Sequence, residues 1–306
     1  MNSKLDTIRF QIANKTLLKY FVFHFKRKKT AKLFGSDKDN FIGKYLFNYH
    51  FNCKKPKSFN EWICFYKNNY HNELWEKCAD KLGSKEFLKS LNLNEYIVKT
   101  YGIYKNSKEI DLDRLPNNFV LKTNHDCGTV FVCNKKTTNF KNVFQQLDLS
   151  LNSNYSKNNN EWVYKNINPL IFAEELLYPA KGYDSLVDFK IQTINGKYAF
   201  GYARQCSNGK DYYLLFDGDF SKKDCFYQSI SNRYLLNMKK PEHFEEMIKI
   251  AELIGRNFKE IRVDFYITNK GIKIGELTFF TQSGHGVFTK NEYDYKYGAF
   301  FDNKSI

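Results

Sequence analysis

The chain has 306 residues, of which 48 are Lys or Arg and 33 are Asp or Glu, so its formal net charge is +15. Hydrophobic residues make up 42% and aromatic residues 18%, which excludes a disordered chain because there is ample apolar surface to bury. Only 16 Gly and 5 Pro exclude a collagen-like chain, and no apolar run reaches the roughly 20 residues of a membrane-spanning helix.

Residues 1–50 are predicted to form a basic helical segment with breaks at Gly35 and Gly43. Nine basic residues lie in the first 32 positions, opposed only by Asp6, and aromatic residues are interleaved with them. This pattern leaves three alternatives, which are a solvated helix packed on the body, contact with an anionic membrane surface, and contact with nucleic acid. Nucleic acid is the least favoured partner, because the remaining charge is spread along the chain rather than gathered into a reader motif.

The chain has seven cysteines, an odd number, and no two of them have the CxxC spacing. Neither a zinc site nor a disulfide framework is therefore predicted. Reduced, scattered thiols fit a cytoplasmic protein. Residues 17–25 are apolar but interrupted by Lys19 and His24, and no small-residue cleavage site follows, so no secretory signal is predicted.

After this segment the pattern alternates between helical and strand-like stretches. Helices are expected from Phe59, over 73–91 and over 242–258, where apolar residues recur at helical spacing. Strands are expected over 96–104, 119–122, 129–133, 170–174, 187–194 and 198–204, with a polar loop at 150–160. Asn195-Gly196 is typical of a tight hairpin turn. Helices come first and β-rich segments follow, so an α+β fold is predicted.

The most informative stretch is IRVDFYITNKGIKIGELTFF, at 261–280. Apolar and polar residues alternate over 261–267, which predicts a strand with two distinct faces. Asn269-Lys270-Gly271 can form a three-residue hairpin loop with Gly271 in the left-handed conformation. That register pairs Thr268 with Ile272.

The same register places Asp264 opposite Glu276 and Arg262 opposite Thr278. Opposed Cβ atoms lie about 4.5–5.5 Å apart, so the two carboxylates repel unless a cation lies between them. Mg²⁺ prefers carboxylate and phosphate oxygens, and Arg262 adds a fork for a phosphate or acyl-phosphate oxygen. The alternative is a solvent-facing strand surface on which Arg262 neutralises the acids.

A second candidate site is Lys122 at the end of a buried strand, followed by the polar loop Thr123–Thr129. One ammonium and several backbone N–H groups there could bind a polyphosphate, although an ordinary hairpin gives the same pattern. Residues 79–85 (ADKLGSK) alone are typical of a surface helix. Glu174 and Glu175 could simply be a strand end in water, and His125 and His285 are expected to be loop hydrogen-bonding residues.

The ordered motifs DKLxSK, VLKTNHDCG, IFAEELL, DFKIQTING and RVDFY…GELTFF resemble the ATP-grasp superfamily. More closely, the chain resembles the TupA-like ATP-grasp branch associated with bacterial surface-polysaccharide genes. Matching segments run from 55–62 to 292–300, and the first 50 residues match least. The resemblance implies an ATP-grasp fold that holds a nucleotide between two α+β subdomains. The domains it implies are 1–50 (basic helical segment), 51–114 (N-terminal subdomain), 115–175 (small ATP-grasp subdomain) and 176–306 (C-terminal subdomain with the Mg²⁺ and ATP site).

Carried onto this sequence, the resemblance implies a role for each of its motif residues. Lys81 and Lys122 contact the ATP phosphates, and the loop from Thr123 through Gly128 to Thr129 closes over them. Glu174, Glu175 and Leu177 form the adenine hinge, Asp188 lies near the ribose, and Lys190 reaches a phosphate. Asp264 and Glu276 bind Mg²⁺, and Arg262 lies at the reacting carboxyl group. Two departures are that Thr278 stands where many of these enzymes have Asn, and that Gly128 is the only glycine of the loop.

The implied activity is an ATP- and Mg²⁺-dependent, ADP-forming carboxylate–amine ligase that makes an amide through an acyl phosphate. Its expected substrates are a carboxylate-bearing sugar or glycan, such as a uronic acid of a capsular polysaccharide, and an amine. His285 is a candidate for the base that deprotonates the amine. The expected location is the cytoplasm, at the inner face of the membrane if residues 1–32 bind anionic lipid.

Three other functions remain open at this point. A glycosyltransferase would need a DxD metal motif, and Asp111-Leu112-Asp113 fits the letters but has the composition of a turn. A small-molecule kinase would have the same ATP half-site. A non-catalytic basic protein would bind a membrane or polyanion through residues 1–32.

Overall fold

The structure, a computed structural model, describes residues 38–153, 156, 160–227 and 233–302. The predicted basic segment over 1–32 therefore lies outside the described residues. The chain forms two compact units, the first made of residues 1–70, 199–240 and 280–306 and the second of residues 71–198 and 241–279. Over the described ranges, no helix combines the length and apolar character needed to cross a bilayer.

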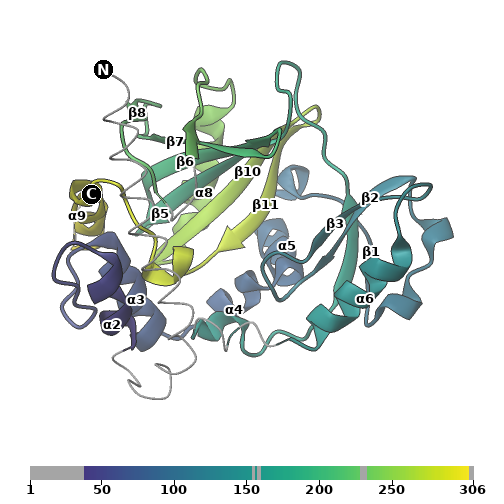
Figure 1. Cartoon of the computed structure of the whole chain (residues 1–306), viewed down its shortest axis with the longest axis horizontal. Helices are drawn as coiled ribbons and strands as arrows, with labels where there is room; N and C mark the ends of the chain where they lie inside the picture. Colours follow the sequence, from purple (N-terminus) through teal and green to yellow (C-terminus); the bar gives the residue numbers. More distant parts are fainter. Residues whose placement is uncertain (1–37, 154–155, 157–159, 228–232, 303–306) are drawn as a thin grey trace. The chain divides into compact units, whose positions relative to one another are not determined.

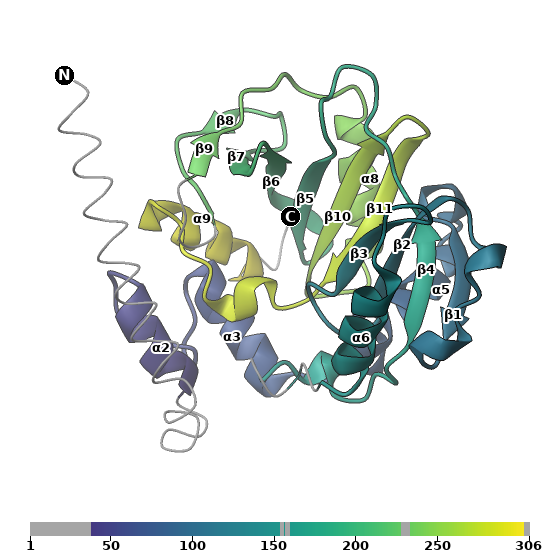
Figure 2. The same cartoon turned by 45° about the vertical axis from the view of Figure 1, so that its right-hand side comes forward.

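The second unit contains a four-stranded antiparallel sheet, called here the small sheet. Its strands are β1 (Thr100–Tyr104), β2 (Asn118–Thr123), β3 (Val130–Asn134) and β4 (Ile171–Glu175), in the order β1-β4-β2-β3. Helix α6 (Phe140–Leu151) covers one face (Figures 1 and 2), where Phe119 and Leu121 pack against Val143 and Leu147. Because side chains alternate along a strand, Val120 and Lys122 point to the opposite face.

Leu121→Ala is expected to lower the free energy of unfolding by about 2–5 kcal/mol, because it leaves a cavity that the sheet and helix cannot fill. Leu121 is fully buried in the core between the small sheet and α6. Urea denaturation followed by circular dichroism measures the effect. An unchanged denaturation midpoint would contradict the packing described here.

The second unit also contains three long strands and a covering helix. The strands are β5 (Val187–Ile194), β10 (Glu260–Thr268) and β11 (Gly271–Thr278), paired antiparallel in the order β11-β10-β5. Helix α8 (Phe244–Gly255) lies against one face (Figure 1). Of the apolar residues predicted to form its stripe, Phe244, Met247, Ala251 and Ile254 are buried, while Ile248 is half-buried and Phe258 lies beyond the end of the helix. The helix is shorter than the predicted 242–258. The other face of the three strands carries their polar side chains.

The single helix predicted over 73–91 is in fact two helices, α4 (Glu73–Ala79) and α5 (Lys81–Ser90). Asp80 separates them in an extended conformation and caps α5 by accepting a hydrogen bond from the Leu82 N–H at 2.9 Å. Aspartate competes for backbone donors in this way and so favours caps over helix interiors. The prediction missed that signal, and the break turns the first residue of α5, Lys81, into a helix terminus.

Short 3₁₀ turns complete the second unit: η2 (Asn94–Tyr96), η3 (Ser107–Glu109), η4 (Leu112–Arg114) and η5 (Trp162–Tyr164). The strand predicted from residue 96 therefore begins only at Thr100. Asn195 and Gly196, with φ of +50° and +78°, form the predicted tight turn after β5. From this turn the chain continues into β6 (Lys197–Ser207).

The first unit contains the helices α2 (Lys38–Leu46), α3 (Phe59–Asn69) and α9 (Asn291–Asp302), the turn η6 (Thr281–Gly284), and the strands β7 (Lys210–Phe216), β8 (Lys222–Lys223) and β9 (Arg233–Leu235). Ser58 and Glu61 form a capping box that starts α3 as predicted from Phe59. The predicted break at Gly43 is wrong, because Gly43 lies within α2. A Cβ there would be 2.2 Å from the Phe51 ring, so close packing explains this glycine.

Burial raises the pKa of Asp294 on α9 to about 6, although Tyr49 and Asn60 donate hydrogen bonds to its carboxylate. Because the folded-state pKa lies above the unfolded value, the stabilisation from the protonated form is complete below about pH 4 and is lost as the pH rises through 6. The loss is up to about 3 kcal/mol. Denaturation from pH 4 to 7 should show wild type losing stability relative to Asp294→Asn, whereas parallel curves would contradict this account.

Candidate functional site

The predicted pairing of two acidic residues across the β10–β11 hairpin is confirmed. Asp264 lies opposite Glu276, and Arg262 lies opposite Thr278. Near the turn the predicted register is wrong, because Thr268 pairs with Gly271 rather than with Ile272. A bulge at Gly275, between the pairs Asp264–Glu276 and Phe265–Ile274, restores the predicted alignment. The bulge thus sets which residues face Asp264.

Asp264 is buried and lies between two cations. The Arg262 guanidinium donates to both carboxylate oxygens, from Nε at 2.5 Å and from Nη2 at 2.7 Å, and Lys190 Nζ donates to Oδ2. Arg262 Nη2 also donates to Thr278 Oγ1 at 2.9 Å. Burial raises the pKa of Asp264, but Arg262 and Lys190 outweigh burial and hold the pKa below its usual range. The carboxylate is therefore ionised at neutral pH.

Asp188 and Lys190 extend the same polar surface onto β5. Lys190 is directly opposite Asp264, and its Nζ lies 2.6 Å from Asp188 Oδ2. Asp188 Oδ1 is buried and has no hydrogen-bond partner among the described residues. Burial raises the pKa of Asp188, and the neighbouring Asp264 adds to the rise while Lys190 opposes it. A buried oxygen of this kind is costly unless a ligand or cation meets it.

The oxygens on this surface are of the hard type that Mg²⁺ takes, and in this structure those of Asp264 accept hydrogen bonds from Arg262 and Lys190. Asp264 and Glu276 offer carboxylate oxygens, and Thr278 offers a hydroxyl oxygen. Asp188 Oδ1, on strand β5, is a further oxygen on the same polar surface. The Glu276 side chain is 31% exposed, so one side of the pair is open to solvent and to a phosphate. Of the predicted metal ligands, the structure thus brings all three onto adjacent strands.

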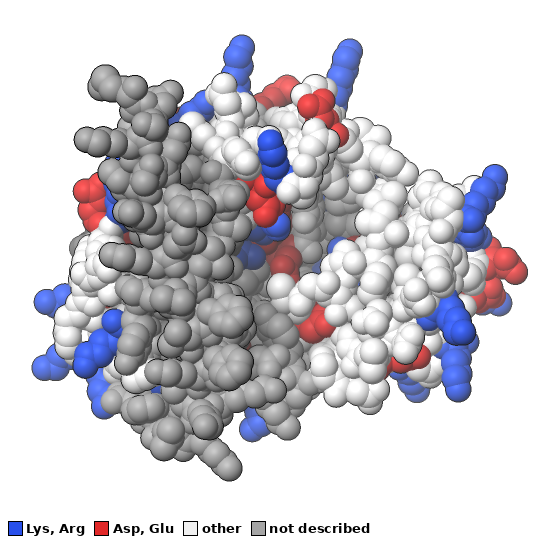
Figure 3. Space-filling model, viewed as in Figure 1, with Lys and Arg blue, Asp and Glu red and all other residues white. Residues whose placement is uncertain are grey.

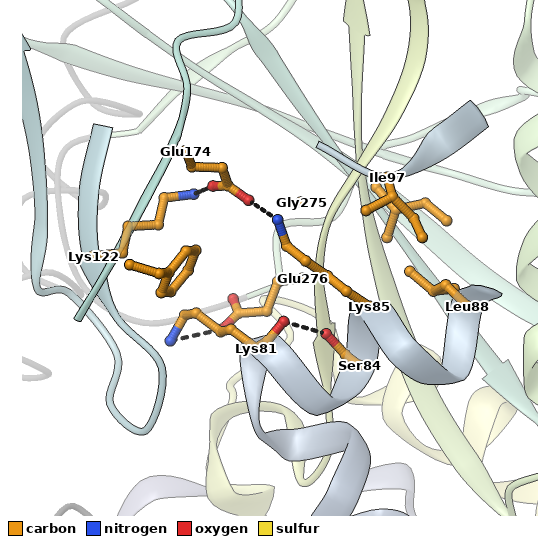
Figure 4. Close-up of a pocket in the computed structure, with 11 residues that line it drawn as sticks. Lys81, Ser84, Lys85, Leu88, Ile97, Lys122, Glu174, Gly275 and Glu276 are labelled. Atoms are coloured by element: carbon orange, nitrogen blue, oxygen red, sulfur yellow. Dashed lines mark hydrogen bonds and ion pairs between the residues drawn. The ribbon is translucent and has the colours of Figure 1, made fainter. Parts of the chain in front are cut away.

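A pocket opens beside Glu276 and is drawn in Figure 4. Helix α5 supplies Lys81, Ser84 and Lys85, while β2 supplies Lys122 and β4 supplies Glu174. The remaining lining comes from Leu88, Ile97, Phe172, Ile274, Gly275 and Glu276. Lys81 Nζ lies 3.8 Å from Glu276 Oε1, which links the pocket to the carboxylate pair. Three ammonium groups around one pocket are suited to a polyphosphate.

Glu174 joins two of these lysines. Its Oε1 accepts from Lys85 Nζ and its Oε2 from Lys122 Nζ, each at 2.6 Å (Figure 4). Sequence reasoning missed Lys85, although it lies four residues after Lys81 on one helix and therefore on the same face. Its predicted neighbours at this pocket, Lys81, Lys122 and Glu174, are all present.

The loop that follows Lys122 is tied together by Asp126, another residue the sequence reasoning missed. Thr123 Oγ1 and Ser150 Oγ each donate to the Asp126 carboxylate at 2.6 Å, and Thr129 Oγ1 also donates to it. Lys81 Nζ donates to the Asp126 carbonyl oxygen. Gly128 has φ of +104°, which L-residues rarely adopt. This anchoring leaves the tip of the loop near Gly128 as its least constrained part.

The other predicted hinge residues lie at the end of β4. Glu175 pairs with Lys270 in the tip of the β10–β11 hairpin, and Leu177 is partly exposed. Beyond them, the Tyr178 carbonyl accepts from Asn269 N–H at 3.1 Å and Ala180 N–H donates to the Ile267 carbonyl at 3.3 Å. The segment therefore connects the small sheet to the hairpin that carries the acids.

Both candidate histidines make hydrogen-bond or ion-pair contacts. His125 Nε2 lies 3.1 Å from the Ser150 carbonyl oxygen, as expected for a loop hydrogen-bonding residue. In the first unit, His285 Nε2 lies 3.4 Å from Asp39 Oδ1 and 3.9 Å from Cys64 Sγ. These three could each offer one metal ligand, and they form the one such group found among the described residues.

The group in the first unit is already neutralised without a metal. Lys67 is fully buried and its Nζ lies 2.9 Å from Asp39 Oδ1, so an ammonium already satisfies that carboxylate. Burial raises the pKa of the Cys64 thiol well above its usual value, which keeps it protonated. The arrangement is that of a buried ion pair with hydrogen-bonding neighbours. His285 as a base stays a prediction.

Two features could indicate other functions, namely the Asp111–Asp113 pair and the distribution of basic side chains. Asp111 and Asp113 are exposed on η4, where Asp111 accepts from the Asp113 N–H at 3.0 Å as a turn residue does. On the face shown in Figure 3, the Lys and Arg side chains of the described residues lie around the edges in small groups, with acidic side chains among them. Over the described part of that face, the basic side chains do not form a continuous stripe.

Several solved structures are similar to this chain. The D-alanine–D-alanine ligase of Bacillus anthracis complexed with ATP is 13% identical, with a TM-score of 0.40 over 74% of this chain and 62% of that one. The biotin carboxylase domain of Hydrogenobacter thermophilus 2-oxoglutarate carboxylase, in complex with MgADP, is 13% identical, with a TM-score of 0.44 over 80% of this chain and 51% of that one. The chain thus spans between half and two thirds of these solved chains.

No curated protein sequence matches the chain. A family model described as TupA-like ATPgrasp matches residues 61–302, which include the predicted lysines, the loop, the β4 hinge and the acid-bearing hairpin. The fold is α+β, as predicted, and its strands pair antiparallel except where β7 pairs with β9. The chain belongs to the TupA-like ATP-grasp family.

Proposed function

We propose that the chain is an ATP- and Mg²⁺-dependent ligase that joins a carboxylate to an amine and releases ADP. The observation that carries this proposal is the convergence of Lys81, Lys85 and Lys122 on one pocket, next to the opposed carboxylates Asp264 and Glu276. A triphosphate bridging the lysines would extend toward the acids. Membership of the ATP-grasp family supports the same reading.

In this proposal the chain binds and orients both reactants. Lys81 and Lys122 hold the phosphates, the loop from Thr123 to Gly128 covers them, and Glu175 and Leu177 flank the base. Asp188 and Lys190 extend the polar surface toward the ribose and phosphates. Asp264, Glu276 and Thr278 would hold Mg²⁺, which when bound neutralises charge that develops on the phosphate oxygens. Arg262 holds Asp264 in place through its Nε and Nη2 atoms and places its positive charge beside the reacting carboxyl group.

The chemistry follows from the reactants. A carboxylate is a poor acyl donor because its leaving group would be oxide. A carboxylate oxygen therefore attacks the γ-phosphorus of ATP, and the bond from that phosphorus to the β-phosphate oxygen breaks. ADP departs, and the product is an acyl phosphate. The amine then attacks the acyl carbon, loses a proton and displaces inorganic phosphate. Positioning and charge neutralisation account for the catalysis, and no side-chain nucleophile is needed.

The direct test measures ADP release from purified protein with ATP and Mg²⁺ over a matrix of uronic acids and amines. At least one pair should release ADP in an amount that matches the amide formed. ADP release with a carboxylate but no amine would instead favour a kinase that stops at the acyl phosphate. Protection from thermal unfolding by UDP-sugars and not by ATP would favour a glycosyltransferase.

The substrate class and location belong to the same proposal. A carboxylate of a capsular or other surface polysaccharide fits the family branch, and such glycans are assembled at the inner face of the membrane. The basic residues of the first 32 positions suit anionic lipid. Flotation with phosphatidylserine vesicles should retain the full chain and lose a chain lacking residues 1–32. Equal flotation of both chains would contradict membrane binding through residues 1–32.

A further inference from the structure

Glu174 differs from the other acids at the pocket because both of its oxygens bind lysines. The side chain is 5% exposed, and the two N–O distances to Lys85 and Lys122 are 2.6 Å. The lysines come from α5 and β2, so one carboxylate connects a helix with the small sheet (Figure 4). Charge-assisted bonds of this length are strong and directional.

Lys85 is held by a complete set of acceptors. In addition to Glu174, its ammonium donates to the Val98 carbonyl at 2.7 Å and to Thr100 Oγ1 at 2.8 Å. An ammonium has three N–H donors, so these bonds fix its position. Lys122 has Glu174 as its one hydrogen-bonded acceptor among the described residues, which leaves donors directed at the pocket.

We infer that Glu174 is a positioning residue that holds Lys122, with the fixed Lys85 as its anchor, in the geometry that binds the ATP phosphates. This inference rests on the proposed function. Each of its two oxygens accepts a hydrogen bond from one lysine, so the carboxylate is held between the two ammonium groups. The role is mechanical and electrostatic, because one anion fixes two cations that would otherwise repel each other.

The directions in which the pKa values of Glu174 and Lys85 are shifted support this positioning role. Burial raises the pKa of Glu174, but Lys122 and Lys85 outweigh burial and lower it. Burial lowers the pKa of Lys85, and Glu174 opposes that fall. Removal of the Glu174 charge should therefore let Lys85 lose its proton at a lower pH. The other charged groups around Lys85 are Lys81 and Lys89 on α5, Lys122 on β2 and Glu276 on β11.

The test is calorimetric binding of the non-hydrolysable analogue AMPPNP with Mg²⁺ to the full chain from pH 7 to 10. Glu174→Gln should weaken binding about 10- to 100-fold, the effect of losing a charge-assisted hydrogen bond. Its affinity should also decline at a lower pH than that of wild type. Glu174→Asp keeps the charge on a shorter side chain, so it should bind AMPPNP more weakly than wild type does. Its affinity should nevertheless decline at the same pH as that of wild type.

Asp148→Asn is the matched control. Asp148 accepts two hydrogen bonds from Ser107 on the α6 side of the small sheet, so its loss removes a carboxylate without touching the pocket. It should bind AMPPNP as wild type does. Wild-type affinity and pH profile in folded Glu174→Gln would overturn this inference alone. Failure of wild type to bind AMPPNP would overturn both the inference and the proposed function.

Discussion

Asp264→Asn should reduce ATP-dependent ADP release at least about 100-fold, the usual cost of removing one charge-stabilising group from an active site. The amide cannot neutralise a cation, and it leaves Arg262 and Lys190 without their shared anion. The change should act on turnover rather than on assembly of the pocket, since the lysines of α5 and β2 stay in place. A coupled ADP assay measures the loss.

Loss of fold is the competing explanation for that result, because removing one partner of a buried ion pair can cost about 3–5 kcal/mol. The variant Glu276→Gln distinguishes loss of fold from loss of the catalytic carboxylate. Its side chain is 31% exposed and its ion pair with Lys81 is long, at 3.8 Å, so stability should be nearly unchanged. ADP release should still fall by a similar factor. Two folded variants that keep more than half the wild-type rate would contradict the role of these acids.

Lys122→Met should weaken ATP binding about 10- to 100-fold, because a charged hydrogen bond to phosphate is worth about 1.5–3 kcal/mol. The methionine keeps the length of the side chain and much of its packing against the sheet. The effect should appear as a raised KM for ATP and as a lost thermal shift with MgATP. Isothermal titration gives the affinity directly.

Lys136→Met is the matched control for Lys122→Met. Lys136 is exposed in the turn after β3, so the same charge is removed from the same subdomain without touching the pocket. ATP affinity should be unchanged. Equal weakening by both substitutions would indicate a general effect of net charge and would remove Lys122 from the phosphate site.

The pairing of Asp264 with Glu276 could be predicted from sequence because alternation and turn residues constrain a hairpin strongly. The prediction assumed a three-residue loop and an unbroken ladder. The structure has Thr268 paired with Gly271 and a bulge at Gly275, and the two differences cancel by the time the strand reaches Glu276. Glycine within a strand is a known signal of a bulge, so that feature was open to prediction.

The pocket was predictable only in part, because its contacts join distant segments. Lys85 and Glu174 are 89 residues apart, and no local pattern indicates that a helix side chain reaches the end of β4. The same limit hid the role of Asp126, which depends on Ser150 at the end of α6. By contrast, the apolar stripe of α8 and the start of α3 at Phe59 are local features, and both were predicted from residue type and spacing.

The most direct test of the account is a crystal structure of the chain with Mg²⁺ and AMPPNP. We expect Mg²⁺ within about 2.1 Å of carboxylate oxygens of Asp264 and Glu276. The analogue's phosphates should lie against Lys81 and Lys122. A nucleotide bound elsewhere, or a magnesium ion held without either carboxylate, would contradict it.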